Sequence, residues 1–173
     1  MQTSSNKTGK ILLTTETELF QSIIDEKHPF RRLNEILDFE TLVAPMRATY
    51  STMGASGIDV VSGVKALLIQ FWENYSDREM EKALRENLAI RWFCGFGLTE
   101  ETPDHSYFGK LRKRVGTKRV AHFFKEVNAV LESRGLFGNV FTFIDASSII
   151  TKTALWEERD RAIADGAEKL NNK

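Results

Sequence analysis

The sequence predicts a mainly α-helical protein that ends in a single β-strand. Through most of the chain, apolar residues recur at three- and four-residue spacing, which is typical of helices with one buried face. The period changes at residues 140–144 (VFTFI), where β-branched and aromatic residues on both alternating sides predict a strand buried on both faces. With 173 residues, 42% of them hydrophobic, the chain is large enough to bury one ordinary core.

The first half of the chain is expected to begin with a disordered lead-in at the polar residues 1–10. Helices are expected from Thr14 to about residue 28, over 31–39 and over 40–50, with Pro45 marking a kink or an early boundary in the third. A turn-rich loop follows at 51–57. The next segment, 58–72, is the most apolar helix predicted in the chain, and we expect it to form the centre of the core.

The segment 76–116 is predicted to hold two helices on either side of a glycine-containing break. Ser76 and Glu79 have the spacing of a capping box, which marks a helix start, and apolar residues then continue at helical spacing through Leu88 to Trp92. The second helix is expected to begin at Thr102-Pro103, because proline at the first helical position removes no hydrogen bond. It runs to residue 115, and a further helix follows over 120–131. Residues 157–173 are expected to form a short exposed helix.

Composition narrows the function classes. The formal net charge is zero, so any argument for nucleic-acid binding must rest on a local cluster of charge. Cys94 is the only cysteine, which excludes an intramolecular disulfide and fits a reducing cytoplasm, and we expect it to pack as a small apolar residue. No apolar run is long enough to span a bilayer, and the N-terminus lacks the apolar core of a signal peptide.

Positive side chains cluster along the helices that follow residue 103. No carboxylate occurs between Lys110 and Lys125. Such a cluster can neutralise DNA phosphates and release counterions, and the helix starts near Thr102 and Thr117 can add backbone amides. The alternative is an ordinary cationic surface balanced in space by glutamates at 100, 101 and 126. The candidate DNA-binding residues are Lys110, Arg112, Lys113, Arg114, Lys118, Arg119 and Lys125, with His122 beside them.

Other side chains carry weaker signals. The three histidines share no spacing with Cys94 or with a carboxylate pair that would predict zinc. Trp92 is expected in the core with Arg91 shielding its edge, although an exposed Trp could stack on a base. The helices on either side of the break resemble a helix-turn-helix, but the link from 94 to 101 is longer than that motif needs.

The stretch SDREMEKALRENLAIRWFCGFGL…TPDHSYFGKLRKRVG resembles the N-terminal region of insertion-sequence-five-like transposases, the DDE cut-and-paste enzymes of bacterial mobile elements. HPFRRL at 28–33 and FIDA at 143–146 extend the resemblance over nearly the whole chain. It implies a helical DNA-binding domain over 11–138, followed over 139–173 by the start of an RNase-H-like α/β catalytic domain. It also implies a bacterial cytoplasmic protein associated with the nucleoid.

Asp145 stands where the family carries its first catalytic Asp, at the end of the first strand. DDE enzymes hold two divalent cations with three carboxylates, and Mg²⁺ prefers such oxygen ligands. The second Asp and the Glu are expected far downstream, and the sequence ends at Lys173. The later acidic residues lie too close to Asp145 to replace them: Glu157, Glu158, Asp160 and Asp165. We therefore expect an incomplete metal site, Mg²⁺ only in the intact family enzyme, and no DNA cleavage by this chain alone. Without the resemblance, Asp145 is interpreted as a polar residue that ends a strand.

The expected function is that of the DNA-binding N-terminal part of an insertion-sequence transposase, which recognises terminal inverted repeats in double-stranded DNA. Its expected partners, besides DNA, are a second copy of itself or a full-length transposase. Two alternatives stay open. One is an inhibitory fragment that binds the ends without catalysis. The other is one subunit of a split transposase, because the unpaired strand at 140–144 could pair with a second chain that supplies the missing carboxylates.

Overall fold

The structure is a computed structural model that describes residues 3–5, 11–49 and 57–136. This part is mainly helical, which confirms the predicted fold class. The predicted strand at 140–144, Asp145 and the predicted helix at 157–173 lie outside the described residues. Along the chain, the elements are β1 (Thr3–Ser5), β2 (Ile11–Leu13), α1 (Thr14–Ile23), α2 (Pro29–Ile36), α3 (Phe39–Arg47), α4 (Val60–Trp72), α5 (Asp77–Glu86), α6 (Leu88–Phe93), α7 (His105–Val115) and α8 (Thr117–Ser133).

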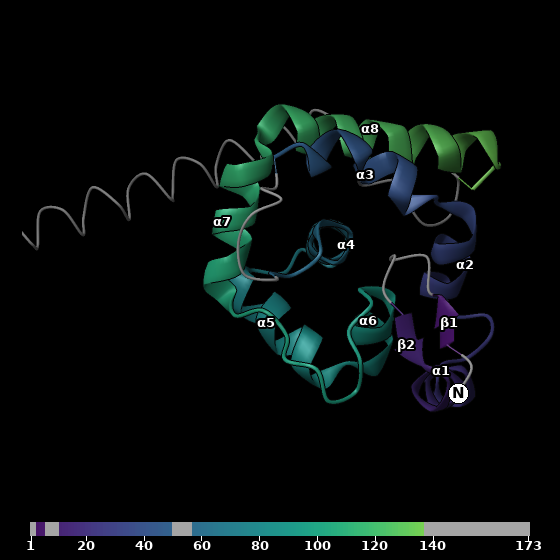
Figure 1. The fold of residues 1–173 in the computed structure, drawn as a ribbon. Coiled ribbons are helices and arrows are strands. Elements are labelled where there is room, and N and C mark those ends of the chain that lie inside the picture. Colours follow the sequence, from purple (N-terminus) through teal and green to yellow (C-terminus); the bar gives the residue numbers. More distant parts are fainter. Residues whose placement is uncertain (1–2, 6–10, 50–56, 137–173) are drawn as a thin grey trace, which may run out of the picture.

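Helix α4 is the centre of the core, as its apolar sequence predicts. Figure 1 shows it end-on, with α2, α3, α5, α6, α7 and α8 placed around it. All of its residues from Val60 to Phe71 are buried. Because neighbours surround it, its polar residues are buried too. Lys65 donates from Nζ to Asn34 Oδ1 at 2.7 Å, and its Nζ lies 4.5 Å from the centroid of the Phe39 ring.

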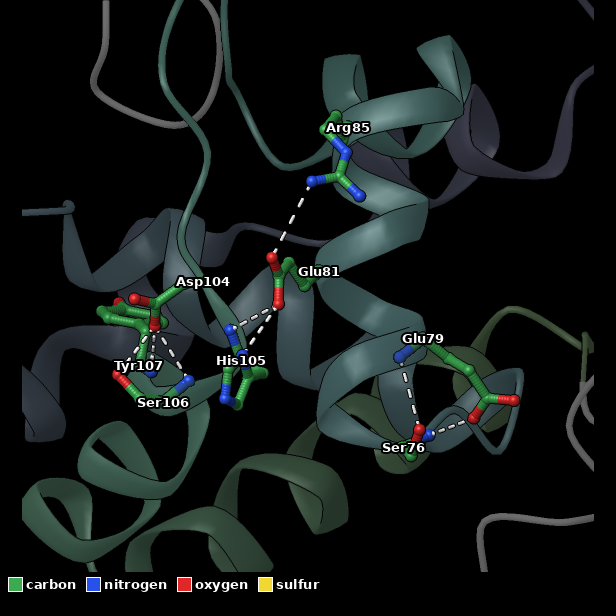
Figure 2. Close-up of polar contacts among 8 residues, drawn as sticks. All are labelled: Ser76, Glu79, Glu81, Arg85, Asp104, His105, Ser106 and Tyr107. Carbon is green, nitrogen blue, oxygen red and sulfur yellow. Dashed lines mark hydrogen bonds and ion pairs between the residues drawn. The ribbon is translucent and has the colours of Figure 1, made fainter.

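Side-chain caps decide where the helices around α4 begin. The predicted capping box is confirmed at α5: Ser76 Oγ accepts from Glu79 N at 3.3 Å, and Glu79 Oε2 accepts from Ser76 N at 2.7 Å (Figure 2). The prediction of one helix from 76 to 92 is wrong. Asn87 divides it into α5 and α6, because its Oδ1 accepts from the backbone amides of Ala89 and Ile90 at 3.0 and 3.1 Å. Such local bonding by Asn competes with helix continuation.

The N-terminal residues also differ from the sequence-based expectation. Thr3–Ser5, expected to be disordered, forms β1 and pairs antiparallel with β2, with Thr3 opposite Leu13 and Ser5 opposite Ile11. Helix α1 then ends at Ile23 and not near residue 28. Its C-terminal carbonyls bind one guanidinium: Arg31 donates from Nη2 to Ile24 O at 2.7 Å and to Gln21 O at 2.9 Å. This contact fixes the end of α1 against α2.

A second contact fixes the start of α1 against the segment that follows α6. Glu16 Oε1 accepts from Leu98 N at 3.1 Å, although 82 positions separate the two residues. Together, the two contacts hold the end of α1 against α2 and its start against the segment that follows α6. In the described part of the chain, no helix has the length and apolar character needed to cross a membrane.

Candidate nucleic-acid interface

Helix α7 carries four of the seven predicted DNA-binding residues, and two carboxylates hold its N-terminus (Figure 2). It begins at His105, two residues later than Pro103, because Asp104 caps it. Asp104 Oδ1 accepts from the amides of Ser106 and Tyr107 at 2.8 and 3.2 Å. Glu81 of α5 accepts from His105 N at 3.0 Å, and the same oxygen lies 2.9 Å from His105 Nδ1. The first turn of α7 is therefore tied to α5.

These hydrogen bonds favour the ionised carboxylates. The side-chain hydrogen bond to His105 is the main reason that the pKa of Glu81 lies below its ordinary value, and the bond to the His105 amide adds to it. The hydrogen bond from the Ser106 side chain likewise lowers the pKa of Asp104. Both groups are charged at neutral pH and place negative charge at the positive end of the helix dipole.

The other end of α7 is held by a buried ion pair. Arg112 binds Asp77 of α5 in a bidentate arrangement, with Nη1–Oδ1 and Nη2–Oδ2 distances of 2.8 and 2.9 Å. Gln70 of α4 donates to the same Asp77 Oδ1 at 2.7 Å. The side chain of Arg112 is only 4% exposed. This corrects the prediction that Arg112 contacts DNA: its guanidinium joins three helices and is not offered to a ligand.

The remaining predicted residues are all exposed, and they lie on two consecutive helices. We call this set the basic face; it consists of Lys110, Lys113 and Arg114 on α7 and of Lys118, Arg119, His122 and Lys125 on α8. The α7 residues lie three and four positions apart, so they are neighbours on that helix, and 118, 122 and 125 follow one side of α8. Helices α7 and α8 meet at a corner (Figure 1). Gly116 makes this corner with a φ of 82°, a conformation that favours glycine.

Most of the charge on the basic face is not neutralised by neighbours. His122 Nδ1 lies 4.0 Å from Glu126 Oε1, and Arg119 donates to Val115 O at 3.2 Å. Among the described residues, no carboxylate lies within 4.0 Å of Lys110, Lys113, Lys118 or Lys125. Glu100, expected as a balancing charge, instead accepts from Gly97 N at 3.0 Å. Four lysine ammonium groups are therefore available to an anionic ligand.

The link between α6 and α7 is organised by Arg91, whose role the sequence analysis missed. Its Nε donates to Gly97 O at 2.6 Å, and its other nitrogens donate to Leu84 O and Glu100 O. Arg91 is thus a buried cap for backbone carbonyls, while the guanidinium over the half-buried Trp92 ring is that of Arg31, at 5.4 Å. The link spans residues 94–104, which is longer than a helix-turn-helix turn, as the sequence predicts.

No other group of described residues forms a candidate catalytic or metal site. Cys94 is fully buried, as expected, and desolvation raises the pKa of its thiol to about 12, so it stays protonated. His28 caps α2 by accepting from Phe30 N at 3.2 Å. Within the described ranges, no three His, Cys, Asp or Glu side chains come together in a way that could hold a metal ion. The predicted metal ligand Asp145 and the acidic residues after it lie outside those ranges.

Comparison with known proteins adds one match. The family model described as Transposase domain (DUF772) matches residues 18–114, which is more than half of the chain. The matched range runs from α1 to the last turn of α7, and so it includes the capped break at Asn87, the Arg91 link and both attachments of α7. No solved structure matches the chain.

Proposed function

This chain belongs to the transposase-domain family DUF772, and on that premise we propose that its basic face binds double-stranded DNA. The observation that carries the proposal is the set of four exposed lysines without a described carboxylate partner, placed on two helices that meet at a corner. By the resemblance to insertion-sequence-five-like transposases, the DNA is the terminal inverted repeat of a bacterial insertion sequence, and the cell compartment is the nucleoid-containing cytoplasm.

The anchoring of α7 supports this role. A phosphate-binding surface gains affinity when its charged groups do not have to be ordered on binding. Glu81 and Asp104 fix the first turn of α7, and the pair between Arg112 and Asp77 fixes the last, so the basic side chains extend from a rigid helix. The lysines supply sequence-independent attraction to phosphates. Recognition of the repeat must come from contacts to base edges.

The experiment that tests the proposal is a salt titration of DNA binding. Binding of the full 173-residue chain is measured by the fluorescence anisotropy of a labelled duplex that carries the terminal repeat of the encoding element. A scrambled duplex is measured in the same way for comparison. We expect tighter binding to the repeat, and a log–log salt slope that falls by about 0.9 for each lysine–phosphate contact removed in Lys113→Ala or Lys118→Ala. The matched control is Lys27→Ala, an exposed lysine between α1 and α2.

Two results would contradict parts of this proposal. Equal affinity for the two duplexes would show that the chain does not recognise the repeat. Salt slopes for Lys113→Ala and Lys118→Ala that equal that of the control would show that the basic face does not contact phosphates.

We further propose that the DNA-binding part serves DDE chemistry, with Mg²⁺ as the metal of the intact enzyme and Asp145 as one of its ligands. Support for this comes from the resemblance and from the type of donor, because Mg²⁺ prefers carboxylate oxygens. Asp145 lies outside the described residues, so this assignment stays a prediction. Binding of Mn²⁺ in place of Mg²⁺ to the intact enzyme, followed by electron paramagnetic resonance with and without Asp145→Asn, tests it.

A further inference from the structure

A second surface lies between the end of α1, the outer side of α5 and the start of α6. It is a groove of 740 Å³ with an apolar floor that includes Ile23, Ala83, Leu88 and Ala89. Leu88 has the helical spacing of an apolar face, yet its side chain is 38% exposed, and that of Ile23 is 54% exposed. Among the described residues, the exposed large hydrophobic side chains are these two and Leu19, one turn before Ile23 on α1. Such concentration of exposed apolar surface marks an interaction site.

The rim of this groove is acidic. Asp25, Glu79 and Glu86 line it, and the one lysine among the lining residues, Lys82, already lies 3.8 Å from Glu86. Glu79 is fixed in the capping box of α5, and its hydrogen bonds to Ser76 lower its pKa, so it stays ionised. Tyr75, also in the lining, has its pKa raised by burial and by the negative charges of Glu73 and Glu79. Three carboxylates and one lysine thus line the groove, so its balance of charge is opposite to that of the basic face.

We propose that this groove binds a basic amphipathic helix of a protein partner, with leucine- or isoleucine-sized side chains on the floor and Lys or Arg side chains against the acidic rim. Helices bind such grooves through apolar residues at three-, four- and seven-residue spacing. The same carboxylates repel DNA phosphates, so the groove is not an extension of the DNA surface. Helices α1 and α6 lie across α4 from the corner of α7 and α8 (Figure 1), and the chain can hold DNA and the partner together.

A second copy of the described part fits this groove poorly. Docking groove against groove would bring the acidic residues at 25, 79 and 86 of two copies together, which is repulsive. Docking the basic face of one copy in the groove of another would satisfy the charges but leave the floor uncovered. The exposed large hydrophobics of the described residues are all on α1 and α6, so the basic face offers none. Neither arrangement of two described parts both covers the floor and pairs the rim, so we assign the groove to a different protein that combines both features.

The test uses two synthetic helical peptides with the full-length chain. Both have the same leucine face; one has lysines on its flanks and the other has glutamates. We expect the Leu/Lys peptide to bind at least about tenfold more tightly by fluorescence anisotropy, a difference that opposite potentials at a rim can supply. Ile23→Ser and Leu88→Ser, at exposed positions that leave the core intact, should weaken that binding several-fold. Glu86→Lys should reduce the preference between the peptides.

The DNA assay separates this inference from the proposed function. Ile23→Ser should bind the labelled duplex normally, while Lys113→Ala should bind the Leu/Lys peptide normally. Equal binding of the two peptides, or binding of the Leu/Lys peptide that Ile23→Ser and Leu88→Ser leave unchanged, would overturn the inference. A dimer in light scattering that Ile23→Ser dissociates would also overturn it, because a second copy would then occupy the groove.

Discussion

Replacement of Arg112 by Met tests the assignment on which the sequence and the structure differ most. The sequence groups Arg112 with its cationic neighbours as a DNA contact. The structure buries its guanidinium against Asp77, with both hydrogen bonds below 3.0 Å. Methionine retains most of the aliphatic volume and the helix propensity of the side chain but removes the charge. Asp77 is then left with Gln70 as its hydrogen-bond donor from α4.

The size of the effect follows from the burial of the two groups. Removing one partner of a buried ion pair destabilises a protein by about 3–5 kcal/mol, because the other charge stays desolvated. Asp77 keeps 16% of its side chain exposed, against 4% for Arg112, so some solvation of the orphaned carboxylate is possible. We therefore expect the lower end, about 3 kcal/mol. With a urea slope of about 2 kcal/mol per molar, the unfolding midpoint falls by about 1.5 M.

The assay is urea denaturation of the full chain followed by far-ultraviolet circular dichroism. The matched control is Lys113→Met, the next residue on the same helix, which is exposed and should change the unfolding free energy by no more than about 0.5 kcal/mol. The double variant Arg112→Met with Asp77→Leu should recover part of the loss, since it removes both charges. If Arg112→Met unfolds at the same urea concentration as Lys113→Met yet loses DNA affinity, the reasoning is refuted and Arg112 is a DNA contact.

Three further changes probe the attachment of α7 and the break before α6. Gly63→Ala on α4 places a methyl group against the Tyr107 hydroxyl, and this steric overlap should lower the unfolding free energy by about 1–3 kcal/mol. Alanine offsets roughly 1 kcal/mol of that loss, because it favours a helix more than glycine does. A raised melting temperature in calorimetry would contradict the prediction. Asn87→Ala removes the cap of α6 and should destabilise by about 1 kcal/mol in urea unfolding, whereas no change would show that the cap is dispensable. Folding lowers the pKa values of Glu81 and Asp104, so the stability that these carboxylates contribute is complete above their unfolded values of about 4.3 and 3.9 and disappears as the pH falls through the lower folded values. Amide exchange in the first turn of α7, corrected for intrinsic rates, should therefore accelerate in that acidic range. A Glu81→Gln variant with an unchanged exchange profile would refute the role of that carboxylate.

Local signals explain the part of the fold that the sequence predicts well. The capping box at Ser76 and Glu79 depends on two side chains three positions apart, and such a pattern is complete within the sequence. The central place of α4 follows from apolar residues on most sides of the helix, because a helix without a polar face must be surrounded. Both features depend on near neighbours alone.

The errors arise where a distant residue or a competing local bond decides. The apolar period continues across Asn87, so periodicity predicts one helix, while the cap formed by the Asn87 side chain makes two. Arg112 lies among other cations and is distinguished from them only by Asp77, 35 positions earlier. Leu88 shares the spacing of buried residues, yet it faces the groove beside α1. Pairings of this kind are fixed by the packing of helices and have no signature in the local sequence.

The partition of charge explains why a net charge of zero is compatible with DNA binding. Sequence-level neutrality removes the argument that the whole protein attracts an anion, but binding depends on the local potential at a surface. In the described part, Arg112 and Asp77 neutralise each other inside the core, while lysines without a described carboxylate partner lie along α7 and α8 and carboxylates line the groove beside α1. At physiological ionic strength the screening length is about 8 Å, so the acidic groove on the far side of α4 barely weakens the field at the basic face. Two surfaces of opposite charge can therefore recognise different ligands on a chain that is neutral as a whole.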